Sequence, residues 1–593
     1  MNHKNIENNF SIIIFLLLVI FPAIEVVSRL FGTTGIVASP VLVQHLTLYI
    51  GFSGAIIASR RNKLLSLSNS LLFNNEDQID WSNIIAKITT IVIVIVLSLG
   101  AWNLVMIEME FPVDIAPFLP RWVALLIMPV GFATISLHMI HNSYSKLKNR
   151  IVLLLIITLT IILFQWEFLR DINFLPYLLI GAILFSLFKG APIFIGLGGL
   201  ALLFFWRDWT PISAISAETY RIVVSPTLST IPLFTLAGYI LAESKASERL
   251  VVLFRALFGW IPGGTPIVLV LLCGFFTALT GGSGVTILAL GGLLMPVLIK
   301  EGYSKVFSLG LITVAGSLGL LFPPSLPLII YGVTAGISIK SVFLAGIVPG
   351  LIRVGMIGGW AVWQGKVQSV TRHNFNIGKV ISSLKDARWE AIIPVLVLFG
   401  IFGGYTTLVE TAALISIYVF VVEFFIYKDL KYNDLQKIIL DCSTLIGGVL
   451  IILGVAMGLT SYLVDAQIPM HLLEWVKSTI SSKFIFLLML NIFLLAVGCL
   501  MDIFSAIIIV VPLITPLGAY FGIDPIHLAI IFIANLELGF LTPPVGMNLF
   551  LSSYRFEEPM SKIYKATLPF FLVMLLSVIA ITYIPILSTW VIK

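Results

Sequence analysis

Two long runs of uncharged residues limit what this chain can fold into. Residues 256–299 carry no charged side chain, and residues 484–523 carry only Asp502. Each run is long enough for two membrane crossings of about 20 residues. Over the whole chain, 59% of residues are hydrophobic and 11% are charged, with a mean hydropathy of +1.08. Because a water-soluble chain carries about 25% charged residues, most of this chain must lie in lipid.

Backbone polar groups in lipid must form their hydrogen bonds within the chain, and apolar runs of this length do so as helices. The sequence therefore predicts an all-α polytopic membrane protein. The net charge of +6 does not indicate nucleic acid, since no basic patch is interleaved with aromatic residues. The three cysteines, Cys273, Cys442 and Cys499, lie in or beside apolar runs without metal-ligand spacing, and we expect neither a disulfide nor a metal role for them.

The charges between the apolar stretches predict the orientation of the first part of the chain. Basic residues precede the first stretch and follow the second and fourth, whereas acidic residues follow the third: Lys4; Arg60, Arg61 and Lys63; Lys146, Lys148 and Arg150; Glu108, Glu110 and Asp114. Because basic loops stay in the cytoplasm, residues 1–145 are predicted to form a four-helix unit with a cytoplasmic N-terminus, followed by a connector helix over 146–172. The first stretch has no strong basic start or cleavage site and is interpreted as a retained span.

The region from 173 to 593 contains a repeat. Five glycines and prolines recur 220 positions later without a gap: Pro296, Gly302, Gly319, Pro323 and Pro324 correspond to Pro516, Gly522, Gly539, Pro543 and Pro544. Since these residue types mark turns and helix breaks, the register predicts a repeated backbone path. We place the repeats around 263–335 and 484–552. A polar cluster in the middle of each uncharged run predicts a helical hairpin that enters the membrane partway and returns.

The tandem prolines of each repeat are expected to break a helix at mid-membrane. The carbonyl oxygens that this frees must face protein or a lined cavity. Internal repeats with broken helices are typical of secondary transporters, in which helix ends and free carbonyls bind a sodium ion and an anionic substrate. The alternative is that these residues only kink packed helices.

Several motifs resemble the large membrane subunit of TRAP (tripartite ATP-independent periplasmic) transporters. They are Thr-Gly-Gly-Ser-Gly-Val-Thr (280–286), Gly-Ser-Leu-Gly-Leu-Leu-Phe-Pro-Pro-Ser-Leu-Pro (316–327), Asn-Leu-Glu-Leu-Gly-Phe-Leu-Thr-Pro-Pro-Val-Gly-Met-Asn-Leu-Phe (535–550), Ile-Pro-Leu-Phe-Thr-Leu-Ala-Gly (231–238) and Leu-Met-Asp-Ile-Phe-Ser (500–505). Residues 1–145 are similar to the small four-helix subunit of the same family, through Glu-Val-Val-Ser-Arg (25–29) and Ala-Ser-Arg-Arg-Asn-Lys (58–63). The resemblance implies a natural fusion of the two subunits.

This resemblance implies an elevator-type permease of the bacterial inner membrane, with two inverted repeats. Such a permease imports an organic acid (a carboxylate or dicarboxylate) by symport with Na⁺, which is the coupling ion, and uses no organic cofactor. Its partner would be a periplasmic substrate-binding protein. The chain departs from common family patterns at Gly282–Ser283, at 407–410 (Thr-Leu-Val-Glu), at Asp502–Ile503 and at Gln44–His45, so the resemblance does not identify which acid is carried.

The candidate site residues are oxygen-bearing side chains and glycines at the hairpins and helix breaks. A carboxylate within an apolar run costs at least about 2.5 kcal/mol and is therefore expected to be functional or paired. The predicted ion ligands are Gly282, Ser283, Gly316 and Gly319 in the first repeat and Asp502, Ser505, Gly539 and Thr542 in the second. The predicted substrate-binding residues are Ser283, Thr286, Ser317, Pro324, Glu537 and Pro544. In the first repeat, Gly282 and Ser317 occupy the positions that correspond to Asp502 and Glu537 of the second. The first repeat thus has no titratable group at these positions, which favours sodium over protons as the coupling ion.

Two other functions compete with this interpretation. A stand-alone sodium–anion symporter would share the hairpins but would not need the first 145 residues. An ion-translocating respiratory subunit would need charged residues along the membrane midplane, and residues 256–299 and 306–339 have none. The sequence contains no Gly-x-x-x-x-Gly-Lys-Ser/Thr loop for phosphate, and we do not expect an enzyme.

Overall fold

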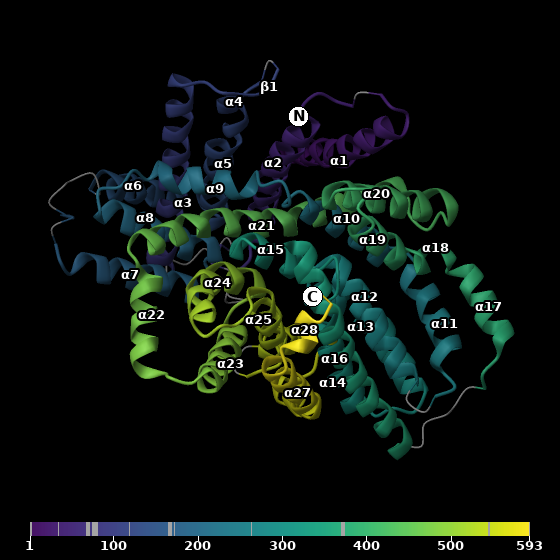
Figure 1. The fold of residues 1–593 in the computed structure, drawn as a ribbon. Helices are drawn as coiled ribbons and strands as arrows, with labels where there is room; N and C mark the ends of the chain where they lie inside the picture. The colour runs from purple at the N-terminus through teal and green to yellow at the C-terminus, as the bar shows by residue number, and fades with distance from the viewer. Residues whose placement is uncertain are drawn as a thin grey trace. The chain divides into compact units, whose positions relative to one another are not determined.

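The structure, a computed structural model, describes residues 3–33, 35–66, 72–73, 81–117, 119–163, 169–170, 172–261, 264–368, 374–543 and 546–591. Apart from one short two-stranded sheet, the elements in these ranges are helices (Figure 1). Ten of these helices are long and apolar enough to cross a membrane, or up to 11 if one bent pair is counted as a span. The chain is an all-α polytopic membrane protein, as the sequence predicts.

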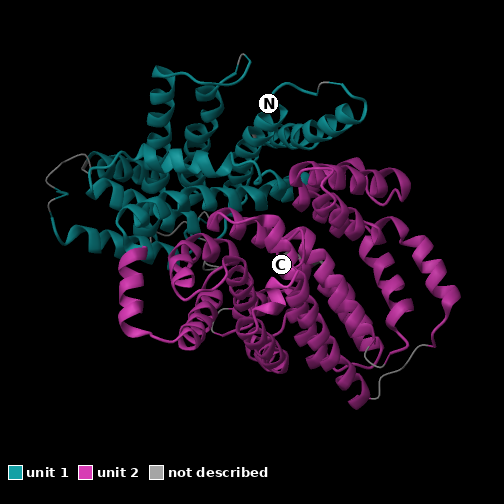
Figure 2. Ribbon diagram, in the orientation of Figure 1, with its two compact units in different colours: residues 1–232, 439–468 teal, residues 233–438, 469–593 magenta. Residues whose placement is uncertain are grey.

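The chain divides into two compact units (Figure 2). Unit 1 comprises residues 1–232 and 439–468. Its elements are α1 (His3–Leu30), α2 (Ser39–Arg60), α3 (Trp81–Glu110), β1 (Asp114–Ala116), β2 (Leu119–Pro120), α4 (Arg121–Leu125), α5 (Ile127–Ser143), α6 (Leu147–Leu163), α7 (Leu175–Phe188), α8 (Ile193–Arg207), α9 (Ser213–Val223) and most of α21 (Tyr432–Asp465).

Within unit 1, α3 is the helix that joins the N-terminal helices to the later ones. It packs on α5 and α6 and also on α7, α8 and α9. Helix α21 crosses α2 where two glycines meet: a Cβ on Gly54 would lie 2.0 Å from the carbonyl oxygen of Ser443, and one on Gly447 would lie 2.1 Å from the backbone nitrogen of Ala55. Such close backbone approach is typical of small-residue contacts between membrane helices. Residues far apart in the sequence thus form one packed unit.

Unit 2 comprises residues 233–438 and 469–593. Its elements are α10 (Thr230–Glu243), α11 (Ala246–Phe258), α12 (Gly264–Thr280), α13 (Ser283–Lys300), α14 (Lys305–Ala315), the 3₁₀-helix η2 (Leu318–Leu321), α15 (Leu326–Ala335), α16 (Ile339–Val367), α17 (Ile377–Asp386), α18 (Arg388–Ala391), α19 (Ile393–Phe402), α20 (Leu408–Val421), the π-helix η3 (Val422–Ile426), α22 (Ile468–Thr479), α23 (Lys483–Leu500), α24 (Ile503–Tyr520), α25 (Pro525–Gly539), α26 (Met547–Phe556), α27 (Met560–Tyr583) and α28 (Ile586–Thr589).

The helix bounds in unit 2 repeat with nearly the same offset of 220 as the glycines and prolines. Helices α12, α13, α14 and α15 begin at 264, 283, 305 and 326, and α23, α24, α25 and α26 begin at 483, 503, 525 and 547. The local cause is visible at one turn of each repeat. Gly302 and Gly522 both have a positive φ, of 98° and 61°, which ends the preceding helix. Ser304 and Asp524 then cap the next helix by accepting backbone N–H bonds.

The two repeats also pack on each other through equivalent pairs of helices. Helix α13 of the first packs on α26 of the second, and its counterpart α24 packs on α15. Likewise, α14 packs on α27, and its counterpart α25 packs on α16. Reciprocal pairs of this kind are what a pseudo-twofold relation between two repeats produces. The repeats therefore bury each other's apolar faces and form a single core.

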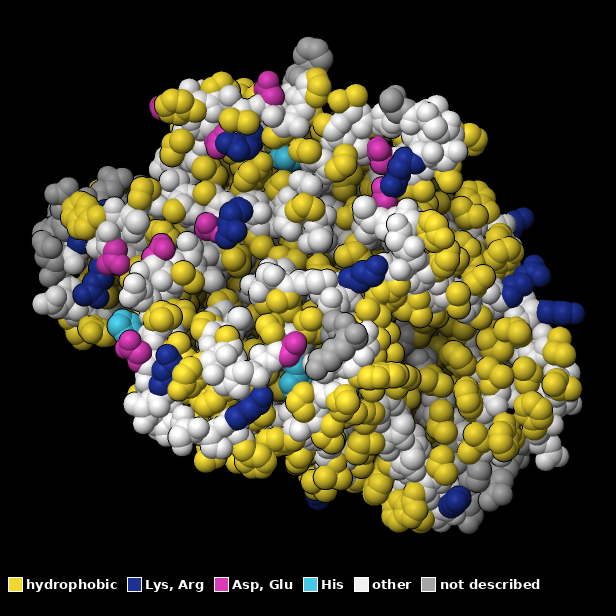
Figure 3. Space-filling model, viewed as in Figure 1, with side chains coloured by type: hydrophobic (Ala, Val, Ile, Leu, Met, Phe, Trp, Pro, Cys, Tyr) yellow, Lys and Arg dark blue, Asp and Glu magenta, His cyan; other side chains and the backbone are white. Residues whose placement is uncertain are grey.

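The surface of unit 2 has few charges on the face that Figure 3 shows. Apolar side chains cover most of the lower right of that view, where Figure 2 draws the helices of unit 2. Many large apolar side chains of this unit are exposed, among them Leu351, Val395, Phe399 and Leu572. A water-soluble protein would not leave so many uncovered, whereas lipid provides an apolar surrounding.

Candidate functional site

The tip of the first hairpin joins α12 to α13 through two glycines. Helix α12 ends at Thr280 and α13 begins at Ser283. Between them, Gly281 has a φ of 71°, a left-handed conformation that favours glycine. A Cβ on Gly281 would lie 2.4 Å from the Cβ of Leu326. The tip therefore contacts the first residue of α15.

The helix break of the first repeat lies against this hairpin. Helix α14 ends at Ala315, the short η2 follows, and α15 starts after Pro323–Pro324, a cis peptide bond. The axes on the two sides of the break differ by 44°. A Cβ on Gly319 would lie 2.2 Å from the carbonyl oxygen of Gly274 in α12. The C-terminal ends of α12 and α14 and the N-terminal ends of α13 and α15 thus meet inside unit 2.

Hydrogen bonds join the hairpin to the break. The hydroxyls of Thr277 and Thr286 lie 2.7 Å apart, and Thr277 also donates to the carbonyl oxygen of Gly316 at 2.8 Å. Ser317 lies just beyond and donates to Val314 of its own turn. The structure thus brings the predicted residues Gly316 and Thr286 together through Thr277, which sequence reasoning missed.

Three buried hydroxyls at this junction lack partners among the described residues. They belong to Thr280, Ser283 and Ser325, each at most 1% exposed. An unpaired buried polar group costs about 1–3 kcal/mol, so three of them at one junction make it a candidate for binding a polar ligand or ion. Ser325 directly follows the proline pair and begins the turn into α15. Hydroxyl oxygens beside helix ends suit a hard cation such as sodium.

The tip of the second hairpin carries a carboxylate at the equivalent position. Asp502 caps α24: its Oδ1 accepts bonds from the backbone N–H groups of Phe504 and Ser505, and the Ser505 hydroxyl donates to its Oδ2 at 2.6 Å. Its counterpart in the first repeat is Gly282, which caps α13 without a side chain. The second tip therefore carries a carboxyl group where the first tip has none.

The end of α25 and the segment after it contact the residues that precede this second tip. A Cβ on Gly539 would lie 2.6 Å from the Cα of Gly498, so α25 and α23 touch backbone to backbone. The backbone N–H of Gly546 donates to the carbonyl oxygen of Cys499 at 3.2 Å. The hydroxyl of Thr542 donates to Leu538 in the preceding helix. Gly539, Gly546 and the residues before Asp502 thus lie together, as the first repeat leads one to expect.

Glu537, two residues before Gly539, belongs to a fully buried ion pair. Glu537 pairs with Arg353 of α16, and both side chains are 0% exposed. Arg353 also donates to the carbonyl oxygen of Ala534 at 2.7 Å, while Oε1 of Glu537 has no partner among the described residues. The sequence predicts that Glu537 is functional or paired and names it as substrate-binding; the structure shows the pairing, with Arg353, which sequence reasoning missed. The missed signal is a lone arginine in the middle of the apolar helix 339–367.

The predicted residues thus fall into two groups, one in each repeat. Pro324 is buried at the first break, and Pro544 lies outside the described residues. The ion and substrate roles of all these residues remain predictions. The described residues contain no group of three or more His, Cys, Asp or Glu side chains that could hold a metal ion. The oxygen donors at the first tip are hydroxyls and backbone carbonyls, and those at the second tip include the Asp502 carboxylate and the Ser505 hydroxyl.

Comparisons with known proteins match both parts of the chain to components of one transporter family. Residues 179–587 match the DctM component of the tripartite ATP-independent periplasmic transporters, and residues 18–149 match the DctQ component. The isethionate TRAP transporter permease protein DctMQ of Oleidesulfovibrio alaskensis is 29% identical over 82% of this chain and 77% of that protein.

Two relatives of the large component alone show a similar level of identity. The C4-dicarboxylate TRAP transporter large permease protein DctM of Vibrio cholerae is 32% identical over 68% of this chain and 94% of its own length. The ectoine TRAP transporter large permease protein TeaC of Halomonas elongata is 28% identical over 67% of this chain and 94% of its own length. Members of this family are transporters and not enzymes. This chain belongs to the tripartite ATP-independent periplasmic transporters and carries the small and large membrane components fused in one polypeptide.

Proposed function

We propose that this chain imports an organic anion across the bacterial inner membrane by coupling it to the entry of sodium. The observation that carries the proposal is the pair of hairpin tips in unit 2, related by the offset of 220 residues. The first tip gathers the unpartnered hydroxyls of Thr280, Ser283 and Ser325, and the second holds Asp502 and Ser505. Helix ends and oxygen ligands at repeated positions suit a cation in each half.

The chemistry of the first tip favours sodium over protons as the coupling ion. Its side chains are hydroxyls, and its nearest acceptors are backbone carbonyls such as that of Gly316. None of these groups gains or loses a proton near neutral pH. A sodium ion needs only oxygen lone pairs, which the first tip supplies.

The class of substrate follows from the relatives. Their names specify isethionate and C4-dicarboxylates, which are anions, and ectoine. We assign an organic acid to this chain, with a periplasmic binding protein as the donor of substrate. Unit 2 holds both tips and is the part that we propose moves in an elevator mechanism, with unit 1 as the scaffold. The α13 and α15 N-termini at the first tip would attract a carboxylate or sulfonate.

Sodium-dependent thermal stability of the purified chain tests the proposal without a known substrate. A ligand that binds only the folded state stabilises it by about 2.7 kcal/mol at 100 times its Kd. We expect NaCl to raise the unfolding midpoint, while equal concentrations of KCl or choline chloride do not. Asp502→Asn should remove the part of this rise that the second tip contributes, because asparagine retains the capping oxygen but not the charge.

Asp524→Asn is the matched control. Asp524 caps α25 with the same pattern of bonds, to the backbone N–H groups of Ile526 and His527, but lies at the other end of the helix that leads to Gly539. A sodium response unchanged in Asp502→Asn would show that the second tip binds no sodium. A response matched by potassium would show that the stabilisation is not specific to sodium. Succinate or isethionate uptake into proteoliposomes that needs no binding protein would instead favour the stand-alone symporter.

A further inference from the structure

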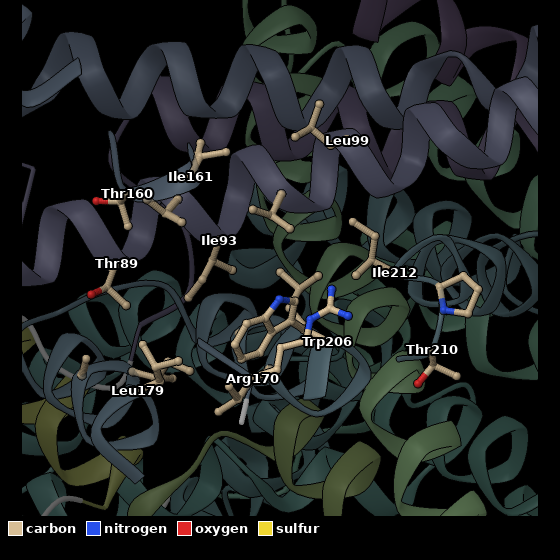
Figure 4. A pocket seen from close by; sticks show the side chains of 18 of the residues that line it. Thr89, Ile93, Leu99, Thr160, Ile161, Arg170, Leu179, Trp206, Thr210 and Ile212 are labelled. Carbon is tan, nitrogen blue, oxygen red and sulfur yellow. The ribbon is translucent and has the colours of Figure 1, made fainter. Parts of the chain in front are cut away.

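Unit 1 contains a cavity of about 720 Å³ that lies between α3, α6, α7 and α8 (Figure 4). This volume is within the range of about 300–1,000 Å³ that is typical of ligand pockets. Along α3 the lining extends from Ile88 to Asn103, which corresponds to about 22 Å at 1.5 Å per residue. The cavity is therefore long enough for an extended chain and too large for a packing defect.

The walls of this cavity are mainly apolar. Each of the four helices contributes aliphatic side chains to it, including Val92, Ile93 and Val96 of α3, Ile161 of α6, Leu179 and Ile183 of α7, and Leu202 and Leu203 of α8. Among the hydroxyl residues of the lining, Thr89 and Thr160 lie near one another in Figure 4, and Thr210 lies apart from them. Walls of this kind bind hydrocarbon and exclude a small polar solute.

One cation lines the cavity at the C-terminal end of α8. The guanidinium of Arg170 lies 3.9 Å from the ring centre of Trp209 and 5.3 Å from that of Trp206, and Figure 4 shows it beside Trp206. Among the described residues, no carboxylate forms an ion pair with Arg170. Trp209 is 62% exposed. Tryptophan and arginine together are typical of the depth at which lipid headgroups lie.

We propose that this cavity binds an anionic phospholipid, with the phosphate on Arg170 and an acyl chain along α3. The charge of Arg170 matches a phosphate, which guanidinium groups bind through paired hydrogen bonds. The apolar length of the cavity matches the hydrocarbon. Leu99, which lines it, is 47% exposed, so an acyl chain can enter from the bilayer.

The bound lipid would also have a structural consequence. Helix α6 leads from the matched DctQ region to the matched DctM region, and it packs on α3 and α5. Helices α7 and α8 pack on α3 as well. A lipid in the cavity fills the space where these helices face one another and so stabilises the junction of the two fused components.

Native mass spectrometry of the full chain, exchanged into defined lipid mixtures, tests this proposal. We expect the chain to retain phosphatidylglycerol in preference to phosphatidylcholine. Arg170→Gln should weaken retention of phosphatidylglycerol by about tenfold, the loss expected for one charged hydrogen bond. Arg207→Gln is the matched control: it removes the same charge next to Trp206, and Arg207 does not line the cavity.

A second pair of variants tests the position of the acyl chain. Ala182 lines the cavity, and Ala182→Phe should displace the lipid by filling the space. A Cβ added to the neighbouring Gly181 would have no atom within 4 Å, and Gly181 does not line the cavity, so Gly181→Phe should retain the lipid. Equal retention by Arg170→Gln and Arg207→Gln, equal retention by the two phenylalanine variants, or no preference for phosphatidylglycerol would each overturn the proposal.

Discussion

Arg353 and Glu537 form an ion pair from which water is excluded, since both side chains are 0% exposed. Removing one partner of such a pair typically costs about 3–5 kcal/mol, because an uncompensated charge stays buried. We therefore expect Glu537→Gln and Arg353→Met each to lower the thermal unfolding midpoint markedly. The double variant Arg353→Met/Glu537→Gln should be more stable than the sum of the two single losses predicts, because it leaves no uncompensated charge buried. Thermal unfolding of the purified chain in detergent measures all three.

The exposed pair Arg221–Glu218 provides the control, with 65% of the Arg221 side chain accessible. Arg221→Gln should change the stability by less than about 1 kcal/mol, as is usual for surface pairs. If the losses of the two buried single variants simply added in the double variant, Arg353 and Glu537 would not be coupled. The interpretation of Glu537 as part of a paired, buried group would then be wrong.

The same pair shows what could be predicted about single residues. A carboxylate in an apolar run must be functional or paired, and this argument found Asp502 and Glu537 from the sequence. The identity of the partner could not be found, because Arg353 and Glu537 are 184 residues apart and only the packing of α16 on α25 brings them together. The unpartnered hydroxyl of Ser325 could not be predicted for a similar reason, since burial depends on elements distant in sequence.

At the scale of elements, the close contact of α23 with α25 gives a sharp prediction. In Gly539→Ala, the new Cβ would lie 2.6 Å from the Cα of Gly498, and a backbone atom cannot move aside as a side chain can. We expect the two helices to separate and the unfolding midpoint to fall. Gly274→Ala in α12 is the control, because nothing lies within 4 Å of its added Cβ and alanine favours a helix by about 1 kcal/mol. Equal effects of the two substitutions would contradict the backbone contact.

The order of these elements could largely be predicted, because glycine and proline determine where a helix can start and stop. The offset of 220 residues between Pro296 and Pro516, or Gly302 and Gly522, recurs to within a residue in the bounds of the helices themselves. The reciprocal packing of α13 on α26 and α24 on α15 could not be predicted. Apolar helices in lipid have no polar face to show which neighbour they contact.

At the scale of the whole molecule, the N-terminal helices make the orientation in the membrane testable. The basic residues Arg60 and Lys63 lie at the end of α2 and just after it, whereas Glu108 and Glu110 end α3. Since basic loops remain in the cytoplasm, we expect the loop after α2 to face the cytoplasm and the loop after α3 to face the periplasm. Both Lys63 and Val113 are exposed, and the three native cysteines are buried.

Cysteines introduced at these two positions measure the orientation in intact cells. A membrane-impermeant maleimide should label Val113→Cys in intact cells, and it should label Lys63→Cys only after the membrane is opened. The unsubstituted chain is the control, because its buried Cys273, Cys442 and Cys499 should give little labelling in either condition. The opposite pattern, with Lys63→Cys labelled from outside, would place the N-terminus in the periplasm. In that case the acidic loop after α3 would face the cytoplasm, and the charge argument for this chain would be wrong.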